Sequence, residues 1–273
     1  ILNINNKENK IMNLSLKGKR AIVCGSTQGI GKAIAIKLAL QGAAITLISR
    51  DEKKLQVTLK ELKLINKNDH NFIVSDFNDL KLLKTKFKDF LKLNLKPTIL
   101  INNTGGPPPG PISKASSDDF EKYMKMHLHC SHYLSTSLIP IMKENKFGRI
   151  INIISISVKA PIDNLGVSNT VRWAMASWAK TLSNEVAEYG ITVNNILPGF
   201  TDTERLQSLL KNRALSSDST IKEITNNTIS NIPAKRFGKP EEIADATSFL
   251  CSKSADYING INLPIDGGFS KSL

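Results

Sequence analysis

The sequence predicts a single α/β domain built on a doubly wound parallel sheet with helices on both faces. Segments typical of strands alternate with segments of helical periodicity along nearly the whole chain, and the strand segments are almost continuously apolar. Strands of that kind are typical of a parallel sheet that is covered on both faces. The length of 273 residues fits one large domain, and no repeat or flexible linker divides it.

In the first half of the chain, short apolar runs predict strands, and apolar residues at helical spacing predict the helices between them. The predicted strands are 21–24, 44–49, 72–75 and 98–102, the last bounded by Pro97. The predicted helices are 31–41, 51–65 and 78–93. The last of these carries an apolar stripe of Leu80, Leu83, Phe87 and Leu91.

In the second half, turn residues and charges mark the element ends. A long helix is predicted at 117–143, because Asp118 and Asp119 suit the positive end of its dipole. Strands are predicted at 149–155, 192–197 and 262–265, and further helices at 169–189 and 241–250, the second opened by Pro240. Residues 201–233 are the least regular part, and we expect them to form a mobile flap over the site.

A glycine-rich turn follows the first predicted strand and leads into a helix, with the spacing G-x-x-x-G-x-G. Glycine permits backbone conformations that other residues avoid, and the start of a helix offers unpaired N–H groups and a partial positive charge to a pyrophosphate. An ordinary surface turn is the alternative. We expect this turn to bind a dinucleotide through Gly25, Ser26, Thr27, Gln28, Gly29, Ile30 and Gly31.

Ligands of parallel α/β sheets lie beyond the carboxyl ends of the strands, so the residues that follow each strand are candidates. Ser49 and Arg50 follow the second strand. A guanidinium there suits a 2′-phosphate, whereas a carboxylate would bind the ribose hydroxyls, so the pattern favours NADP(H) over NAD(H). A surface arginine beside a helix is the alternative. Asp76 and Phe77 follow the third strand, where Asp76 is placed to meet the adenine or to cap the next helix.

The fourth strand is followed by two asparagines, glycines and three consecutive prolines. Asn103, Thr104 and Gly105 are suited to hydrogen bonds beside a cofactor. The stiff proline segment at 107–109 forms either a rigid surface loop or a wall of the substrate pocket.

Bulk properties narrow the class of partner. The net charge is +13, but the lysines are spread along predicted helix faces without interleaved aromatics, so no nucleic acid is expected. The sequence has no run of about 18 apolar residues, so no membrane span is predicted.

Cys24, Cys130 and Cys251 are far apart, which indicates reduced thiols and a cytoplasmic location. Residues 1–11 are polar and patternless, so we expect no secretory signal there. We expect 1–13 to form a disordered extension and Met12 to be the natural start.

Several motifs together resemble the short-chain dehydrogenase/reductase family. They are Gly25-x-x-x-Gly29-Ile30-Gly31, Asn102-Asn103-Thr104-Gly105, Gly148-Arg149-Ile150-Ile151-Asn152, Pro198-Gly199 and Asp266-Gly267-Gly268. The family usually has alanine where this chain has Thr104. The resemblance implies one Rossmann-like domain over 14–273 and hydride transfer between NAD(P) and a carbonyl or alcohol carbon. It also implies assembly as a homodimer or homotetramer, and cofactor contacts from Pro198, Gly199 and Thr201.

The chain departs from the family at the positions that carry its chemistry. In active members a serine polarises the carbonyl, a tyrosine exchanges the proton, and a lysine four residues later lowers the tyrosine pKa and holds the nicotinamide ribose. Ser155 matches the serine, but Ser168 and Arg172 stand where the tyrosine and lysine belong, and His127 stands at the family asparagine. The chain resembles a divergent branch similar to β-ketoacyl carrier-protein reductases.

Two functions remain open on these residues. In the first, the chain is an NADP(H)-dependent oxidoreductase acting on a small molecule. Ser155 contacts the substrate oxygen, Ser168 faces the same pocket, Arg172 orients the ribose or an anionic substrate, and the proton comes from water, His127 or the substrate. A packed histidine is the alternative for His127, and the spacing of the neighbouring histidines disfavours a metal site. In the second, the chain is a catalytically impaired NAD(P)-binding sensor or subunit partner.

Overall fold

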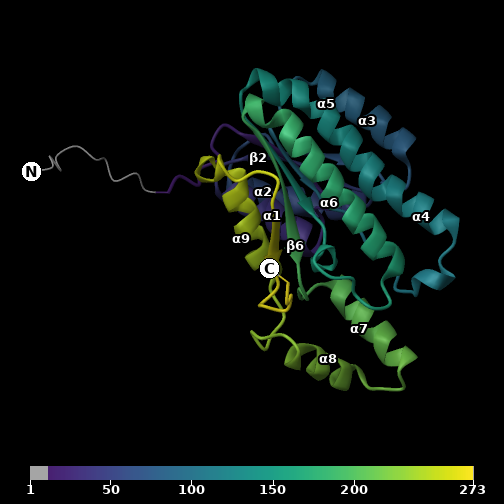
Figure 1. The fold of residues 1–273 in the computed structure, drawn as a ribbon. Coiled ribbons are helices and arrows are strands. Elements are labelled where there is room, and N and C mark those ends of the chain that lie inside the picture. Colours follow the sequence, from purple (N-terminus) through teal and green to yellow (C-terminus); the bar gives the residue numbers. More distant parts are fainter. Residues whose placement is uncertain (1–11, 273) are drawn as a thin grey trace, which may run out of the picture.

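The computed structural model describes residues 12–272 and confirms the predicted parallel sheet (Figure 1). Its seven strands are all parallel and run in the order β3-β2-β1-β4-β5-β6-β7. Their bounds are β1 Arg20–Cys24, β2 Ala44–Ser49, β3 Asn71–Val74, β4 Ile99–Asn102, β5 Gly148–Ile153, β6 Ile191–Pro198 and β7 Asn262–Ile265. The strand order reverses between β1 and β4, and ligand sites of open α/β sheets form at such a point.

Two layers of helices cover the sheet, as predicted. The helices are α1 Gly29–Leu40, α2 Glu52–Ile65, α3 Leu80–Lys92, α4 Ser117–Met124, α5 Cys130–Glu144, α6 Gly166–Val186, α7 Glu204–Ser216, α8 Ile221–Ser230 and α9 Pro240–Cys251. Helices α1, α2 and α9 lie on one face, and α3, α4, α5 and α6 on the other (Figure 1). Each face of the sheet has its own hydrophobic core. Because side chains alternate along a strand, Ala21 and Val23 pack into the core under α1, α2 and α9, whereas Ile22 and Cys24 pack into the core under α3, α5 and α6.

The predicted extension falls almost wholly outside the described residues, since residues 1–11 are not among them. Met12 and Asn13 are described. The Ser254 hydroxyl donates a hydrogen bond to the Asn13 carbonyl oxygen at 3.1 Å.

The predicted helix over 117–143 is interrupted by a π-helical turn at Lys125–His129 between α4 and α5. A π turn inserts one extra residue into the helical repeat and is frequent at functional sites. Periodicity in the sequence cannot reveal it, because the flanking α4 and α5 keep the ordinary repeat. The turn places His127 inside the protein at 2% exposure.

The expectation that 201–233 is irregular is wrong, because the segment forms α7 and α8. The Thr203 hydroxyl caps α7 by accepting from the Leu206 N–H. Thr220 and Glu223 form a reciprocal capping box at the start of α8. Two orphan N–H groups are satisfied by such a box, which stabilises a short helix. Both caps, and in α7 the helical spacing of Leu206, Leu210 and Ala214, are visible in the sequence, and the prediction overlooked them.

A row of asparagines, buried except for Asn262 at its end, crosses the sheet near the site and was missed from the sequence. Asn102 donates to Asn152 and Asn152 to Asn195, each at 2.8 Å, and Asn195 donates to Asn262 at the same distance. These residues occupy paired positions on β4, β5, β6 and β7. Each amide needs its neighbour in the low-dielectric interior, so the row fixes the register of the strands whose ends carry the site.

Candidate active site

The glycine-rich turn between β1 and α1 has the backbone that a phosphate cradle needs. Gly25 and Gly29 adopt positive φ angles of 58° and 51°. A Cβ at Gly31 would lie 2.1 Å from the carbonyl oxygen of Gly25, so only glycine fits there. No side chain caps the first turn of α1, which leaves its N–H groups available to an anion.

A cavity of about 1150 Å³ opens at the carboxyl edge of the sheet, above this turn. It is lined by most of the residues predicted to bind the cofactor or substrate: Gly25, Thr27, Gln28, Gly29, Ile30, Gly31, Ser49, Arg50, Asp76, Phe77, Asn103, Thr104, Gly105, Ser155, Ser168, Arg172, Pro198, Gly199 and Thr201. The tertiary fold therefore brings together residues from the ends of six strands, as expected for a parallel sheet.

Two predicted residues do not line this cavity. Ser26 is fully buried, and its hydroxyl donates to the Ile48 carbonyl oxygen at 3.4 Å. His127 lies behind the wall in the π-helical turn.

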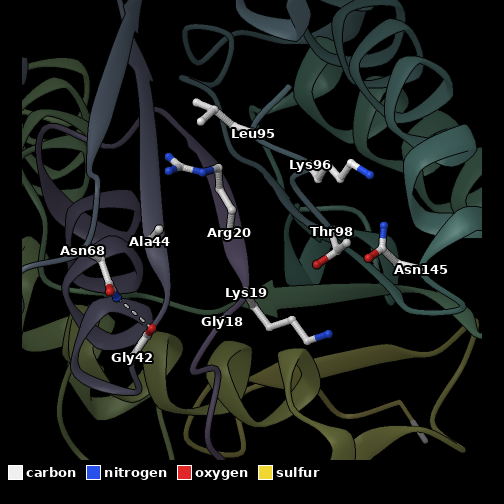
Figure 2. A pocket seen from close by; sticks show the side chains of 10 residues that line it. All are labelled: Gly18, Lys19, Arg20, Gly42, Ala44, Asn68, Leu95, Lys96, Thr98 and Asn145. Carbon is white, nitrogen blue, oxygen red and sulfur yellow. Dashed lines mark hydrogen bonds between the residues drawn. The ribbon is translucent and has the colours of Figure 1, made fainter. Parts of the chain in front are cut away.

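A smaller hollow of about 390 Å³ lies at the opposite edge of the sheet (Figure 2). It is lined by residues at or before the amino ends of the strands: Gly18, Lys19, Arg20, Gly42, Ala44, Asn68, Leu95, Lys96, Thr98 and Asn145. Two of its cations have partners, since Arg20 pairs with Asp69 and Lys96 with Glu144. None of the predicted site residues lies there, so the larger cavity is the candidate active site.

The part of the cavity beside the end of β2, where we expect the adenosine end of a dinucleotide, carries two cations. Arg50 follows β2, is exposed, and forms no ion pair within the described residues. Lys54, one turn further on, also lines the cavity and donates to the Gln28 side chain at 3.0 Å. Lys54 was missed from the sequence, although it lies in the first turn of the helix that follows Arg50. Asp51 lines the same part of the cavity, and its side chain caps α2 by accepting from the Lys54 N–H. The two cations beside it suit a phosphate group.

Asp76 serves the local turn as well as the cavity. Its Oδ1 accepts from the backbone N–H of Asn78 at 2.9 Å. The cap of α3 is Asp79, which accepts from the Leu82 N–H. The alternative that Asp76 caps α3 is therefore wrong. The cap lies three residues later, because the chain makes one more turn before α3 begins.

Asn103 connects the end of β4 to the glycine turn. Its Nδ2 donates to the carbonyl oxygens of Cys24 and Gly25 at 3.2 and 3.3 Å. The residue therefore holds the two strand ends on either side of the reversal point at a fixed distance.

Three polar side chains line the deep end of the cavity. Ser155 follows β5, and its hydroxyl accepts a hydrogen bond from the Ser157 N–H at 3.1 Å. Ser168 and Arg172 lie one turn apart on α6, which places both on the cavity side. Arg172 is 8% exposed and donates to the Ile153 carbonyl oxygen at 3.0 Å. Burial, with a smaller effect from the charge of Arg205, lowers the pKa of Arg172 to about 10, so the group stays charged at neutral pH.

His127 is poorly placed to exchange a proton with a substrate. Burial, reinforced by the charge of Arg172, lowers the pKa of His127 well below its ordinary value, and a hydrogen bond with the Gly105 backbone opposes the shift only in part. The ring is therefore neutral at pH 7. Its Nε2 is buried and has no hydrogen-bond partner among residues 12–272. The contacts point to a residue that supports the 103–106 loop rather than to an acid that protonates a ligand.

A second guanidinium at this end was missed from the sequence. Arg205 on α7 lines the cavity and donates to the Pro107 carbonyl oxygen. No local pattern marks it, because it comes from a helix that the sequence did not predict. Tyr123 on α4 also lines the cavity, because α4 lies against α6.

The chain belongs to the short-chain dehydrogenase/reductase family and is an oxidoreductase. The family profile described as enoyl-(acyl carrier protein) reductase matches residues 25–270, which spans every element of the cavity.

Among curated proteins, the chain is 33% identical over 260 residues to a 3-oxoacyl-(acyl-carrier-protein) reductase, FabG, of Buchnera aphidicola, covering 93% of this chain and 98% of that protein. It is 31% identical to the NADPH-dependent reductase BacG of Bacillus subtilis, covering 93% and 99%. Among solved structures, the L-sorbose reductase of Gluconobacter frateurii in complex with NADPH and L-sorbose superposes with a TM-score of 0.89. That pair is 29% identical and covers 96% of this chain and all of the other.

Within residues 12–272, none of the helices has the length and apolar character needed to cross a membrane.

Proposed function

We propose that this chain transfers hydride between NADP(H) and the carbonyl or alcohol carbon of a small molecule, with an active site that differs from the usual family arrangement. One observation carries the proposal: a single cavity joins the glycine cradle, the cationic adenosine end and the polar group of Ser155, Ser168 and Arg172. NADP(H) is favoured because Arg50 and Lys54 supply two cations where the ribose phosphate would lie. The NADPH named for the similar reductases agrees with this choice.

The nucleotide, when bound, supplies or accepts the hydride. The glycine turn and the start of α1 would hold its pyrophosphate, and Asn103, Thr104, Gly105, Pro198, Gly199 and Thr201 would hold the rest of it. In the reducing direction the carbonyl carbon gains a hydride, its oxygen gains a proton, and NADPH becomes NADP⁺. We assign Ser155 to donate a hydrogen bond to the carbonyl oxygen.

The proton needs a source other than the family tyrosine. None of the chain's four tyrosines is followed by a lysine four positions later. An aliphatic hydroxyl such as that of Ser168 is a weak acid, and His127 is held neutral. Arg172 stays charged and stabilises the negative charge that develops on the oxygen. Water in the cavity then delivers the proton, with Ser168 placed to relay it.

The test is NADPH oxidation measured over a panel of aldehydes, ketones and oxo acids. We expect turnover with at least one compound, and we expect Ser155→Ala to lower kcat by about 10²-fold, the usual loss when one donor to a developing oxyanion is removed. Ser254→Ala, an exposed serine outside the cavity, is the control and should keep wild-type rates. Tight NADPH binding without turnover on any compound would contradict the proposal.

That last outcome would instead favour a non-enzymatic function, in which the chain senses the nucleotide or regulates a partner subunit. The specific observation behind it is that Ser168 and Arg172 line the cavity, at the positions to which the sequence comparison assigns the family's tyrosine and lysine. In that case the double substitution Ser168→Tyr with Arg172→Lys should create NADPH oxidation that the wild type lacks.

We also propose that the chain forms a homodimer or homotetramer, by resemblance to its family, and that it works in the cytoplasm. The three cysteines support the second point, because all are buried and unpaired and burial raises the pKa of each thiol. Light scattering should give a mass of two or four chains, and a monomer would contradict the assembly.

A further inference from the structure

We propose that the substrate carries an anionic oxygen group, a carboxylate or a phosphate, close to the carbon that reacts, and that Arg172 and Arg205 together bind it. This inference rests on the proposed function and narrows it to a class of substrate. It would set this chain apart from reductases whose substrates present a neutral thioester next to the carbonyl.

The two guanidinium groups meet at one point of the cavity wall. A Cβ at Gly106 would lie 3.5 Å from Nη2 of Arg172 and 3.4 Å from Nη2 of Arg205. Arg172 arrives from α6 and Arg205 from α7, while Gly106 belongs to the loop after β4. Three separate elements thus converge there, and the missing side chain of Gly106 leaves both cations open to the cavity.

Neither cation is neutralised by the protein. Within residues 12–272, neither Arg172 nor Arg205 takes part in an ion pair. The carboxylates that line the same cavity, Asp51, Asp76, Asp163 and Glu204, reach neither of them.

The protein uses only part of the donor capacity of the pair. Arg172 donates to the Ile153 carbonyl oxygen and Arg205 to the Pro107 carbonyl oxygen, both neutral acceptors. Each guanidinium has five N–H donors, so several remain for a ligand.

The arrangement is costly without an anion. Arg172 is almost fully buried, and a buried charge is normally paired. The charge of Arg205 adds repulsion, since both burial and Arg205 lower the pKa of Arg172. A carboxylate or phosphate placed between the two would remove both penalties and would be held by charge-assisted hydrogen bonds.

The pyrophosphate of the cofactor is the competing anion. The Thr203 methyl group, two residues before Arg205, lies 3.2 Å from where a Cβ of Gly29 would be, so α7 begins beside the glycine turn. Arg205 could serve the nucleotide from there. The experiment must therefore be done with the nucleotide already bound.

The first measurement is selectivity between charged and neutral partners of the same carbon skeleton. Oxo acids are compared with their methyl esters, and dihydroxyacetone phosphate with dihydroxyacetone, by kcat/KM with saturating NADPH. We expect the charged member to be preferred by about tenfold or more, the ratio that one charge-assisted hydrogen bond supplies. The oxo acids and the sugar phosphate separate a carboxylate site from a phosphate site.

Variants link this preference to the arginine pair. Arg205→Gln should reduce the charged-to-neutral ratio by about tenfold. Lys211→Gln, which removes a cation from the same helix outside the cavity, should leave the ratio at the wild-type value. Equal rates for acid and ester in the wild type, or an unchanged ratio in Arg205→Gln, would overturn the inference while leaving the reductase function intact.

The second measurement does not depend on turnover. Malonate, a carboxylate with no reducible ketone, is added to protein saturated with NADP⁺, and the unfolding temperature is compared with that at equal ionic strength in chloride. We expect a rise in the wild type and in Lys211→Gln, and none in Arg205→Gln. A rise that survives in Arg205→Gln places the anion elsewhere and overturns the proposal. If no compound oxidises NADPH, the proposed function fails, and this measurement alone decides the anion site.

Discussion

Gly31 and Gly25 approach each other so closely that the phosphate cradle depends on the absence of one methyl group. A Cβ at Gly31 would lie 2.1 Å from the Gly25 carbonyl oxygen, well inside van der Waals contact. We expect Gly31→Ala to abolish NADP(H) binding and to lower the free energy of unfolding by about 1–3 kcal/mol, the usual cost of overpacking. Nucleotide fluorescence and urea unfolding measure the two effects.

The matched control is Gly110→Ala, because a Cβ at Gly110 meets nothing within 4 Å. This variant should bind NADP(H) and unfold like the wild type. Equal behaviour of the two variants would show that the cradle tolerates a side chain, contrary to its geometry.

Substitution of Arg50 tests whether the cofactor is NADP(H) or NAD(H). Its guanidinium lines the adenosine end of the cavity, and only NADP(H) carries a 2′-phosphate for it. We expect Arg50→Ala to raise the Kd of NADPH by about tenfold, the value of one charge-assisted hydrogen bond, and to leave the Kd of NADH unchanged. Lys53→Ala, an exposed neighbour outside the cavity, is the control. A parallel rise for both nucleotides would mean that Arg50 does not contact the phosphate.

At the scale of elements, α7 and α8 are the part of the fold most suited to move. Helix α7 supplies Glu204, Arg205, Leu206 and Leu209 to the cavity wall. Helix α8 buries only Thr228, so little apolar packing holds it in place, and such segments open with low free energy. We propose that α7 and α8 close over the bound ligands. The flap expected at 201–233 would then consist of two helices.

Hydrogen exchange of the backbone amides tests this closure. Adding NADP⁺ and a bound substrate should slow exchange in residues 204–230, whereas α9, which packs against α1 on the far face, should not change. Protection spread evenly over both helical layers would contradict a local closure and would indicate general stabilisation by ligand binding.

For the whole molecule, buried histidines make stability depend on pH. His70 accepts from the Ile45 N–H at 3.0 Å, and burial, with the charge of Arg20, lowers its pKa. Burial also lowers the pKa of His127. Because both values fall below that of the unfolded chain, about 6.5, the unfolded state binds more protons as the pH drops. The contribution of these two histidines to the free energy of unfolding is therefore full above pH 6.5 and decreases below it.

Urea unfolding at a series of pH values measures this decrease. His127→Asn removes one of the two groups and should give a shallower loss of stability below about pH 6.5. A stability that stays flat on acidification, or a slope that the substitution leaves unchanged, would show that His127 can take up a proton in the folded state.

Local sequence signals predicted the elements with strong patterns. The bounds of β2 and β7 agree with the prediction to the residue, and the glycine turn, Arg50 and Ser155 all line the cavity as expected. Weak or hidden signals account for the misses. The π-helical turn leaves the flanking helical repeat intact. In α7 the spacing of Leu206, Leu210 and Ala214 marks a helix face, and the prediction overlooked this short signal.

The sequence by itself determined the parallel sheet, the dinucleotide cradle and the family, because these depend on apolar runs, glycines and short motifs that act over a few residues. Only the tertiary structure decided which distant side chains share the cavity. It buried His127 behind the wall and brought Arg205 of α7 to Arg172 of α6 across Gly106. Charge pairing and burial depend on neighbours that the fold supplies from far along the chain, and no local pattern of residues encodes them.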